Sequence, residues 1–225
     1  MPSADAQKGD TPVNGDNHGV RIVPWIQPLF RDRAAAGRVL AEALTDLEDV
    51  VVVGVARGGV AVAAEVTRAL GAPLTAVDVE RVNARGLRLG AVTASGPAYL
   101  REGHGVPGDE VVAAVARARR DAEVLEARLE HEQLAVAGRT ALVVDDGAIT
   151  GLTAAAACAW ARAQDAARIV AAVPVAHVDY LPRLREAADE VVCPHALEQI
   201  AVVGQAYDSF DPLDEWYVAG LLSGR

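Results

Sequence analysis

The sequence is poor in lysine, in cysteine and in long apolar runs. Lys8 is the single lysine among 21 cationic residues, so we expect arginine to supply the cations of any functional site. Cys158 and Cys193 are too few for a disulfide framework, which favours packing roles and a reducing compartment. No apolar run reaches the about 18 residues that span a bilayer, and residues 1–20 lack a signal-peptide core. We therefore expect a cytoplasmic protein with no membrane partner.

The charge and length of the chain limit its partners and its domain organisation. A net charge of −10 opposes general binding to DNA or RNA, because such binding depends on cations that contact phosphates. A chain of 225 residues, 52% of them hydrophobic, can bury one substantial core. Residues 1–20 mix Gly, Pro, Asp and Asn without apolar periodicity. We predict a disordered tail over residues 1–20 and one domain over residues 21–225.

Strand-like and helix-like segments alternate along that domain. Continuous apolar runs predict strands at 49–55, 74–79, 140–144, 168–173 and 190–193. Helical periodicity predicts helices at 30–47, 58–70, 109–136, 151–163 and 178–188, and a long loop is expected over residues 81–108. This alternation predicts an α/β fold in which helices cover both faces of a parallel sheet.

The segment ALVVDDGAITGLT, residues 141–153, carries the most specific chemistry. Asp145 and Asp146 follow a strand, where two carboxylates can accept hydrogen bonds from vicinal hydroxyls. Thr150, Thr153 and the amides of the following helix could hold a phosphate. The pattern suits a ribose that carries a 5-phosphate. An Asx turn with helix capping, or a metal-binding acidic pair like that of a phosphorelay receiver, would also place acids at a strand end.

Two further loops could bind anions. In Ala56-Arg57-Gly58-Gly59 the glycines permit close approach of backbone amides, and Arg57 can add charge-assisted bonds, although an ordinary turn would also fit. The expected loop over 81–108 is locally cationic, because its only acidic residue is Glu102. Its arginines are Arg81, Arg85, Arg88 and Arg101. They indicate an anion nearby, with a solvated surface loop as the alternative.

Residues 141–153 resemble the signature by which type I phosphoribosyltransferases bind 5-phosphoribosyl-1-pyrophosphate (PRPP). The wider runs FRDRAAAGRVLAEAL, VVVGVARGGVAVAAEVTRALGAPL and RIVAAVPVAHVDYLPRLREAADEVVC are similar to a bacterial branch of that superfamily whose acceptors are mostly unassigned. The resemblance covers residues 29–218. It implies the type I fold, a parallel sheet with helices on both faces and a small hood, and Mg²⁺-dependent transfer of phosphoribose to a small-molecule acceptor with release of pyrophosphate.

The resemblance also implies roles for individual residues. Asp145 and Asp146 would hold the ribose hydroxyls. Residues 149–153 would bind the 5-phosphate, and Ala56, Arg57 and Gly58 the pyrophosphate, commonly through a cis peptide. The PRPP-binding residues of the signature are Asp145, Asp146, Gly147, Ala148, Ile149, Thr150, Gly151, Leu152 and Thr153.

Residues outside the signature receive roles by the same resemblance. The segment 81–106 resembles a mobile lid in which Arg81 reaches PRPP, although Val82 stands where relatives often carry lysine. Asp208 would support Mg²⁺ through water, and a capping or surface role for Asp208 is the alternative. A homodimer is one assembly open to the chain.

The acceptor is predicted from a departure. Purine-using relatives have an acidic residue where this chain has Ile149, which disfavours purines. With 4% aromatic residues, the chain offers few stacking platforms for a flat base. We therefore predict an aminocyclitol pseudodisaccharide, as in aminoglycoside biosynthesis. The alternatives are a nucleobase acceptor, a non-catalytic sensor of PRPP or nucleotides, and a Mg²⁺-dependent hydrolase or phosphatase.

Overall fold

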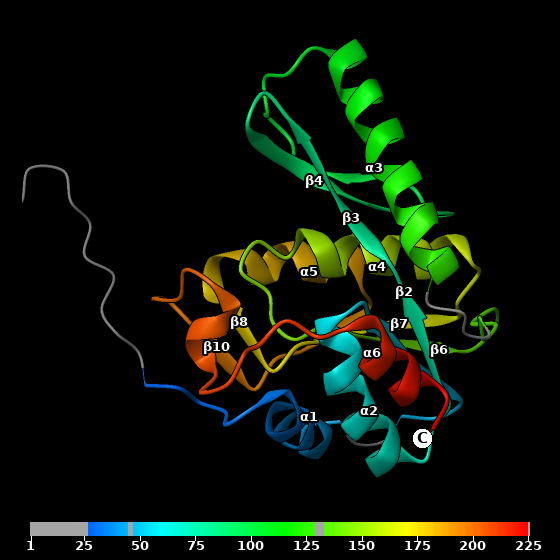
Figure 1. Ribbon diagram of the computed structural model, residues 1–225, viewed down its shortest axis with the longest axis vertical. Helices are drawn as coiled ribbons and strands as arrows, with labels where there is room; N and C mark the ends of the chain where they lie inside the picture. Colours follow the sequence, from blue (N-terminus) through cyan, green and yellow to red (C-terminus); the bar gives the residue numbers. More distant parts are fainter. Residues whose placement is uncertain (1–26, 45–46, 129–132, 225) are drawn as a thin grey trace, which may run out of the picture.

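The computed structural model describes residues 27–44, 47–128 and 133–224 (Figure 1). The predicted tail, residues 1–20, lies outside these residues. The central sheet has five parallel strands in the order β2 (Leu74–Val77), β1 (Val50–Val55), β6 (Thr140–Val144), β7 (Arg168–Ala172) and β9 (Glu190–Val192). The predicted α/β class with a parallel sheet is confirmed.

The valines of β1 show why helices cover both faces of the sheet. Successive strand side chains point to opposite faces. Val51 and Val53 pack against α4 (Leu152–Ala163), whereas Val52 packs against α1 (Arg33–Glu42) and α2 (Gly58–Leu70). Figure 1 places α1 and α2 on one side of the sheet, with α4 and α5 (Leu181–Ala187) on the other.

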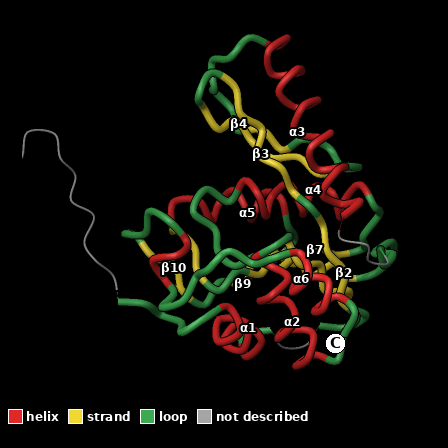
Figure 2. The backbone as a smooth tube through the Cα atoms, in the orientation of Figure 1, coloured by secondary structure: helices red, strands yellow, loops and turns green. Residues whose placement is uncertain are grey.

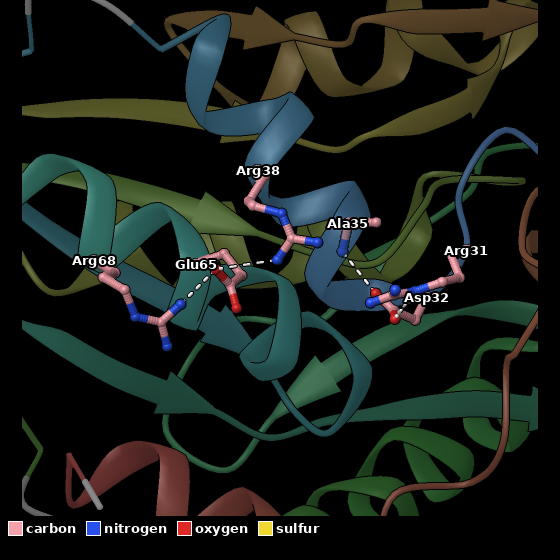
Figure 3. Close-up of polar contacts among 6 residues, drawn as sticks. All are labelled: Arg31, Asp32, Ala35, Arg38, Glu65 and Arg68. Carbon is pink, nitrogen blue, oxygen red and sulfur yellow. Dashed lines mark hydrogen bonds and ion pairs between the residues drawn. The ribbon is translucent and has the colours of Figure 1, made fainter.

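Helices α1 and α2 lie in close contact. A Cβ atom on Gly37 of α1 would lie 2.6 Å from the carbonyl oxygen of Val62, so only glycine allows this approach. Figure 3 shows Glu65 of α2 between Arg38 of α1, with N···O 3.6 Å, and Arg68 of its own helix. The predicted helix over 30–47 begins at Arg33 instead, because Asp32 caps it by accepting a hydrogen bond from the amide of Ala35 at 2.7 Å.

The predicted loop over residues 81–108 is wrong. Strands β3 (Val79–Ala84), β4 (Leu87–Thr93) and β5 (Tyr99–Leu100) form an antiparallel sheet there. The turn between β3 and β4 consists of Arg85 and Gly86, both at positive φ (52° and 72°), the backbone that a two-residue hairpin requires. Helix α3 (Gly108–Arg128) packs on these strands, and Figures 1 and 2 show them projecting together beyond the central sheet.

The glycine within β4 explains the error. Gly90 weakens a strand pattern in sequence, yet a Cβ atom there would lie 2.1 Å from the carbonyl oxygen of Tyr99. Glycine at this position therefore lets β5 approach β4. The predicted helix over 109–136 is also shorter, since α3 ends at Arg128, residues 129–132 lie outside the described residues, and 133–136 are not helical.

The C-terminal region returns to the start of the domain. Strands β8 (Val175–His177) and β10 (His195–Leu197) form a small parallel pair, and the short helix η1 (Val178–Tyr180) precedes α5, so the predicted helix over 178–188 is divided. Phe30 pairs with Tyr207, which follows the short helix η2 (Val203–Ala206), and α6 (Glu215–Leu222) packs on α2. Among the described helices, none combines the length and apolarity needed to cross a membrane.

Candidate active site

A cavity of about 650 Å³ lies where β1 and β6 end, the edge at which open parallel sheets bind ligands. Five separate parts of the chain line it, and the signature is only one of them. The lining includes Arg33, Ala56 and Gly58 from the first third of the chain, Val79, Arg81 and Arg88 from the hairpin, Asp145–Thr153 without Leu152, and Val203, Gly204 and Phe210 from the C-terminal segment.

Asp145 and Asp146 stand at the centre of this lining. The carboxylate of Asp145 accepts a hydrogen bond from the amide of Asp146 at 2.9 Å, and the hydroxyl of Tyr207 donates to the carbonyl of Asp146 at 2.6 Å. Burial raises the pKa of Asp145, and the neighbouring charge of Asp146 adds to that shift. Burial also raises the pKa of Asp146, while the hydrogen bond from Arg33 opposes the rise.

Arg33 is the principal site residue that the sequence reasoning missed. Its Nε donates to Oδ2 of Asp146 at 2.9 Å, and its side chain is only 11% exposed. Its Nη1 donates to the carbonyl of Asp211 at 3.0 Å, and its guanidinium carbon lies 3.8 Å from the centre of the Phe210 ring. One signal in the sequence could have found it. Asp32 is a helix N-cap residue directly before Arg33, and the cap fixes where the helix begins and therefore where Arg33 lies.

The Ala56–Gly59 turn packs closely against the acidic pair. The peptide bond between Ala56 and Arg57 is cis. A Cβ atom on Gly58 would lie 1.9 Å from Oδ2 of Asp146, and one on Gly59 would lie 2.5 Å from the carbonyl oxygen of Val144. The turn therefore touches the signature only because both residues are glycine. The side chain of Arg57 is outside the cavity lining and donates to the carbonyl of Leu213 at 3.4 Å.

Residues 149–153 form the predicted cradle at the start of α4. Gly151 adopts a left-handed conformation (φ 67°) as the N-cap residue, which presents the first amides of the helix. Leu152 is buried in the core and does not line the cavity, whereas Ile149, Thr150 and Thr153 do. A helix N-terminus with hydroxyl side chains beside it is suited to a phosphate.

Two arginines reach this cradle from other elements. Nη2 of Arg88, on β4, donates to Oγ1 of Thr153 at 2.8 Å, and Arg183 of α5 donates to the carbonyl of Thr150. Nε of Arg88 is buried and has no partner among the described residues. Burial lowers the pKa of Arg88, as does the proximity of Arg81 and Arg183, with Asp145 opposing. Clustered cations beside an unpaired donor indicate that an anion belongs here.

Of the remaining predicted residues, Gly147 and Ala148 line the cavity, whereas Asp208 and Arg85 lie outside its lining. Gly147 and Ala148 are buried at its floor, and Ala148 pairs with Ala176 of β8. Asp208 is exposed, does not line the cavity, and donates its amide to the carbonyl of Phe30 at 2.9 Å. Arg85 points to Glu110 of α3, with which it forms an ion pair. The roles assigned to these residues stay predictions.

Asp78 lies behind the Ala56–Gly59 turn, at the end of β2. It is 6% exposed, and its Oδ2 has no hydrogen-bond partner within the described part of the chain. Burial raises its pKa to about 7, helped by the charges of Glu126 and Glu80 and opposed by Arg57. Asp78 does not line the cavity, so we treat it as a buried acid that affects stability.

The donor set fits Mg²⁺ bound mainly through a substrate. In the described residues, no group of three or more His, Cys, Asp or Glu side chains could hold a metal ion by itself. Mg²⁺ commonly uses one or two carboxylates, several waters and substrate phosphates. Asp145 and Asp146 provide carboxylates in the cavity, and the exposed Asp208 could act only through water.

Comparison with known proteins decides the family. The sequence model of the family described as "Phosphoribosyl transferase domain" matches residues 31–209. The chain belongs to the phosphoribosyltransferase domain family. The matched range includes the Ala56–Gly59 turn, the hairpin, the acidic pair and Arg33, so every element that lines the cavity except Phe210 falls within it.

Individual relatives support this assignment over most of the phosphoribosyltransferase domain. Two Mycobacterium tuberculosis proteins provisionally named phosphoribosyl transferases, MT0597 of strain CDC 1551 and Rv0571c of strain H37Rv, are each 38% identical. The match spans 86% of this chain but only 46% of each relative, so the chain spans about half the length of these relatives. The crystal structure of TT1426 from Thermus thermophilus is 37% identical, with a TM-score of 0.75 over 86% of this chain and 97% of that one.

Proposed function

We propose that the protein transfers the 5-phosphoribosyl group of PRPP to a small-molecule acceptor and releases pyrophosphate in a Mg²⁺-dependent reaction. The carrying observation is one cavity in which a half-buried acidic pair stands between two features suited to anions, the Ala56–Gly59 turn and the Ile149–Thr153 cradle. That order matches a ribose with phosphate groups at both ends. The low cysteine content agrees with a cytoplasmic reaction, and a homodimer is the assembly we would test first.

Each group of cavity residues would bind a different part of PRPP. The amides at the start of α4, Thr153 and Arg88 would hold the 5-phosphate, with Arg81 reaching PRPP from β3. Asp145 and Asp146 would fix the ribose hydroxyls and stabilise positive charge on the ring as the bond from carbon 1 to pyrophosphate breaks. The backbone of Ala56, Arg57 and Gly58 would bind the departing pyrophosphate, since the side chain of Arg57 lies outside the cavity lining. Mg²⁺ would neutralise phosphate charge when bound.

The acceptor then forms the new bond to carbon 1, and its proton leaves with solvent or a phosphate oxygen. No protein nucleophile is needed, since pyrophosphate is a good leaving group. Positioning and electrostatic stabilisation would therefore supply most of the rate acceleration.

We propose an amino sugar of the aminocyclitol pseudodisaccharide type as the acceptor, as in aminoglycoside biosynthesis. Ile149 faces the cavity and can neither exchange a proton nor bond a ring nitrogen of a purine. Phe210 is the one aromatic side chain that the described residues place in the lining, and the guanidinium of Arg33 covers one of its faces. A flat base thus has little free aromatic surface on which to stack.

Two alternatives are tested by the same experiment. A nucleobase acceptor keeps the reaction and changes the product, whereas a PRPP or nucleotide sensor would bind without turnover. The measurement is pyrophosphate release from PRPP and Mg²⁺ over hypoxanthine, guanine, adenine, uracil, orotate and neamine-like aminocyclitols, with mass detection of the product. Turnover of a nucleobase, without turnover of any amino sugar, rejects the proposed aminocyclitol acceptor. Binding of PRPP with no release for any acceptor favours the sensor.

A further inference from the structure

Arg33 lies beside the turn proposed to bind pyrophosphate, although it belongs to neither sequence motif. Its Nε is 2.9 Å from Oδ2 of Asp146 and 3.2 Å from the position that a Cβ atom on Gly58 would occupy. Both Arg33 and Gly58 line the cavity. The guanidinium therefore stands where the acidic pair meets the Ala56–Gly59 turn.

The guanidinium of Arg33 is held in place before any ligand binds. Asp146, the carbonyl of Asp211 and the ring of Phe210 contact it from three directions. Asp32, shown with Ala35 in Figure 3, caps helix α1 and fixes the backbone from which Arg33 projects. Nη2 of Arg33 has no hydrogen-bond partner in the part of the chain that the structure describes. A fixed cation with a spare donor can bind an anion at little entropic cost.

The other cavity cations are placed differently. Arg88 donates to Thr153 in the phosphate cradle, and Arg81 projects from the hairpin. Arg57, the arginine of the turn itself, points away and bonds the carbonyl of Leu213. A pyrophosphate group against Ala56 and Gly58 would face the carboxylate of Asp146, and a cation between the two anions would offset their repulsion.

We propose that Arg33 binds the pyrophosphate group of PRPP, bridging it to Asp146. The assignment rests on the proposed function, since it takes the Ala56–Gly59 turn as the pyrophosphate site. Nε keeps its bond to Asp146 while Nη2 donates to a pyrophosphate oxygen, so one planar guanidinium serves both anions. Arg33 is thus a substrate-binding residue supplied by α1, 113 positions from the signature acid that it contacts.

Calorimetry with two probes separates this role from the others. The affinity for inorganic pyrophosphate with Mg²⁺ measures binding at the Ala56–Gly59 turn. The affinity for ribose 5-phosphate measures binding at the acidic pair and the Ile149–Thr153 cradle. For Arg33→Gln we expect pyrophosphate binding to weaken at least about tenfold, because one charge-assisted hydrogen bond to pyrophosphate is lost. The affinity for ribose 5-phosphate should change by at most about threefold, because that bond does not involve ribose 5-phosphate. Arg33→Lys keeps the positive charge but lacks the planar guanidinium, so its pyrophosphate affinity should lie between those of wild type and Arg33→Gln. Arg38→Gln, on the same helix in an exposed ion pair with Glu65, is the matched control and should bind both probes normally.

Unchanged pyrophosphate affinity in Arg33→Gln would overturn the assignment. Equal losses for both probes would also overturn it, because Arg33 would then act only by organising Asp146. Should Arg33→Gln fail to fold by circular dichroism, Arg33→Lys carries the same comparison. A wild-type protein that binds both probes but releases no pyrophosphate from PRPP would reject the proposed transfer and leave the binding role of Arg33 standing.

Discussion

Replacing Gly58 with alanine should disable the site while leaving the fold largely in place. The new methyl carbon would lie 1.9 Å from Oδ2 and 2.7 Å from Cγ of Asp146, whereas Cβ contacts below 3.0 Å essentially never occur. The carboxylate must therefore move by about 1 Å or more and give up its 2.9 Å bond to Arg33. A hydrogen bond to a charged group contributes about 1.5–3 kcal/mol, so kcat/KM for PRPP should fall roughly 10- to 150-fold.

Pyrophosphate release under limiting PRPP measures this loss. Gly220→Ala is the matched control, since a Cβ atom at Gly220 of α6 meets nothing within 4 Å and alanine favours a helix. That variant should keep its activity and gain up to about 1 kcal/mol of unfolding free energy. Wild-type kcat/KM in Gly58→Ala would refute the placement of Asp146 as an essential ribose contact.

Three further predictions use other parts of the molecule. Replacing both Asp145 and Asp146 with asparagine should lower kcat/KM by at least about tenfold, and unchanged turnover would remove their catalytic role. Exhaustive chelation should abolish transfer and Mg²⁺ should restore it, so full activity without metal would exclude the metal role. The raised pKa of Asp78, about 7, means that the folded protein loses stability as pH rises from about 4 to about 7, because the unfolded chain ionises this group first. In urea titrations, Asp78→Asn should therefore gain roughly 2–3 kcal/mol relative to wild type between pH 5 and pH 8, and a pH-independent difference would contradict the burial argument.

The central sheet is well predicted from sequence because its strands carry their own signal. Residues 140–144 are found as predicted, and β1, β7 and β9 each differ by one residue at one end. These strands are continuous apolar runs bounded by turn residues, which is the pattern of strands buried on both faces. The hairpin is different, because β3 mixes polar with apolar residues and has a single fully buried position, and β4 contains Gly90, whose role is visible only once β5 lies beside it.

The candidate site was predicted as far as its residues lie next to one another in sequence. Asp145, Asp146 and the cradle belong to one run, and the Ala56–Gly59 turn to another, so local patterns identify them. Arg33 and Arg183 are missed because tertiary packing brings them to the signature from distant parts of the chain. Arg88 was predicted only as one of four loop arginines, and the hairpin is what brings it to Thr153. Arg85, two residues from the start of β4, turns to Glu110 instead.

The scarcity of lysine acquires a physical meaning at this site. Arg88 is half-buried, and burial lowers the pKa of its guanidinium. A lysine in place of Arg88 could lose its proton near neutral pH, whereas a guanidinium stays charged because its pKa starts so much higher. The planar group is also what allows Arg33 to stack on Phe210 while it donates to Asp146 and to Asp211. An ammonium could satisfy the charge of Asp146 but could not keep all three contacts, so arginine is required here by geometry as well as by charge.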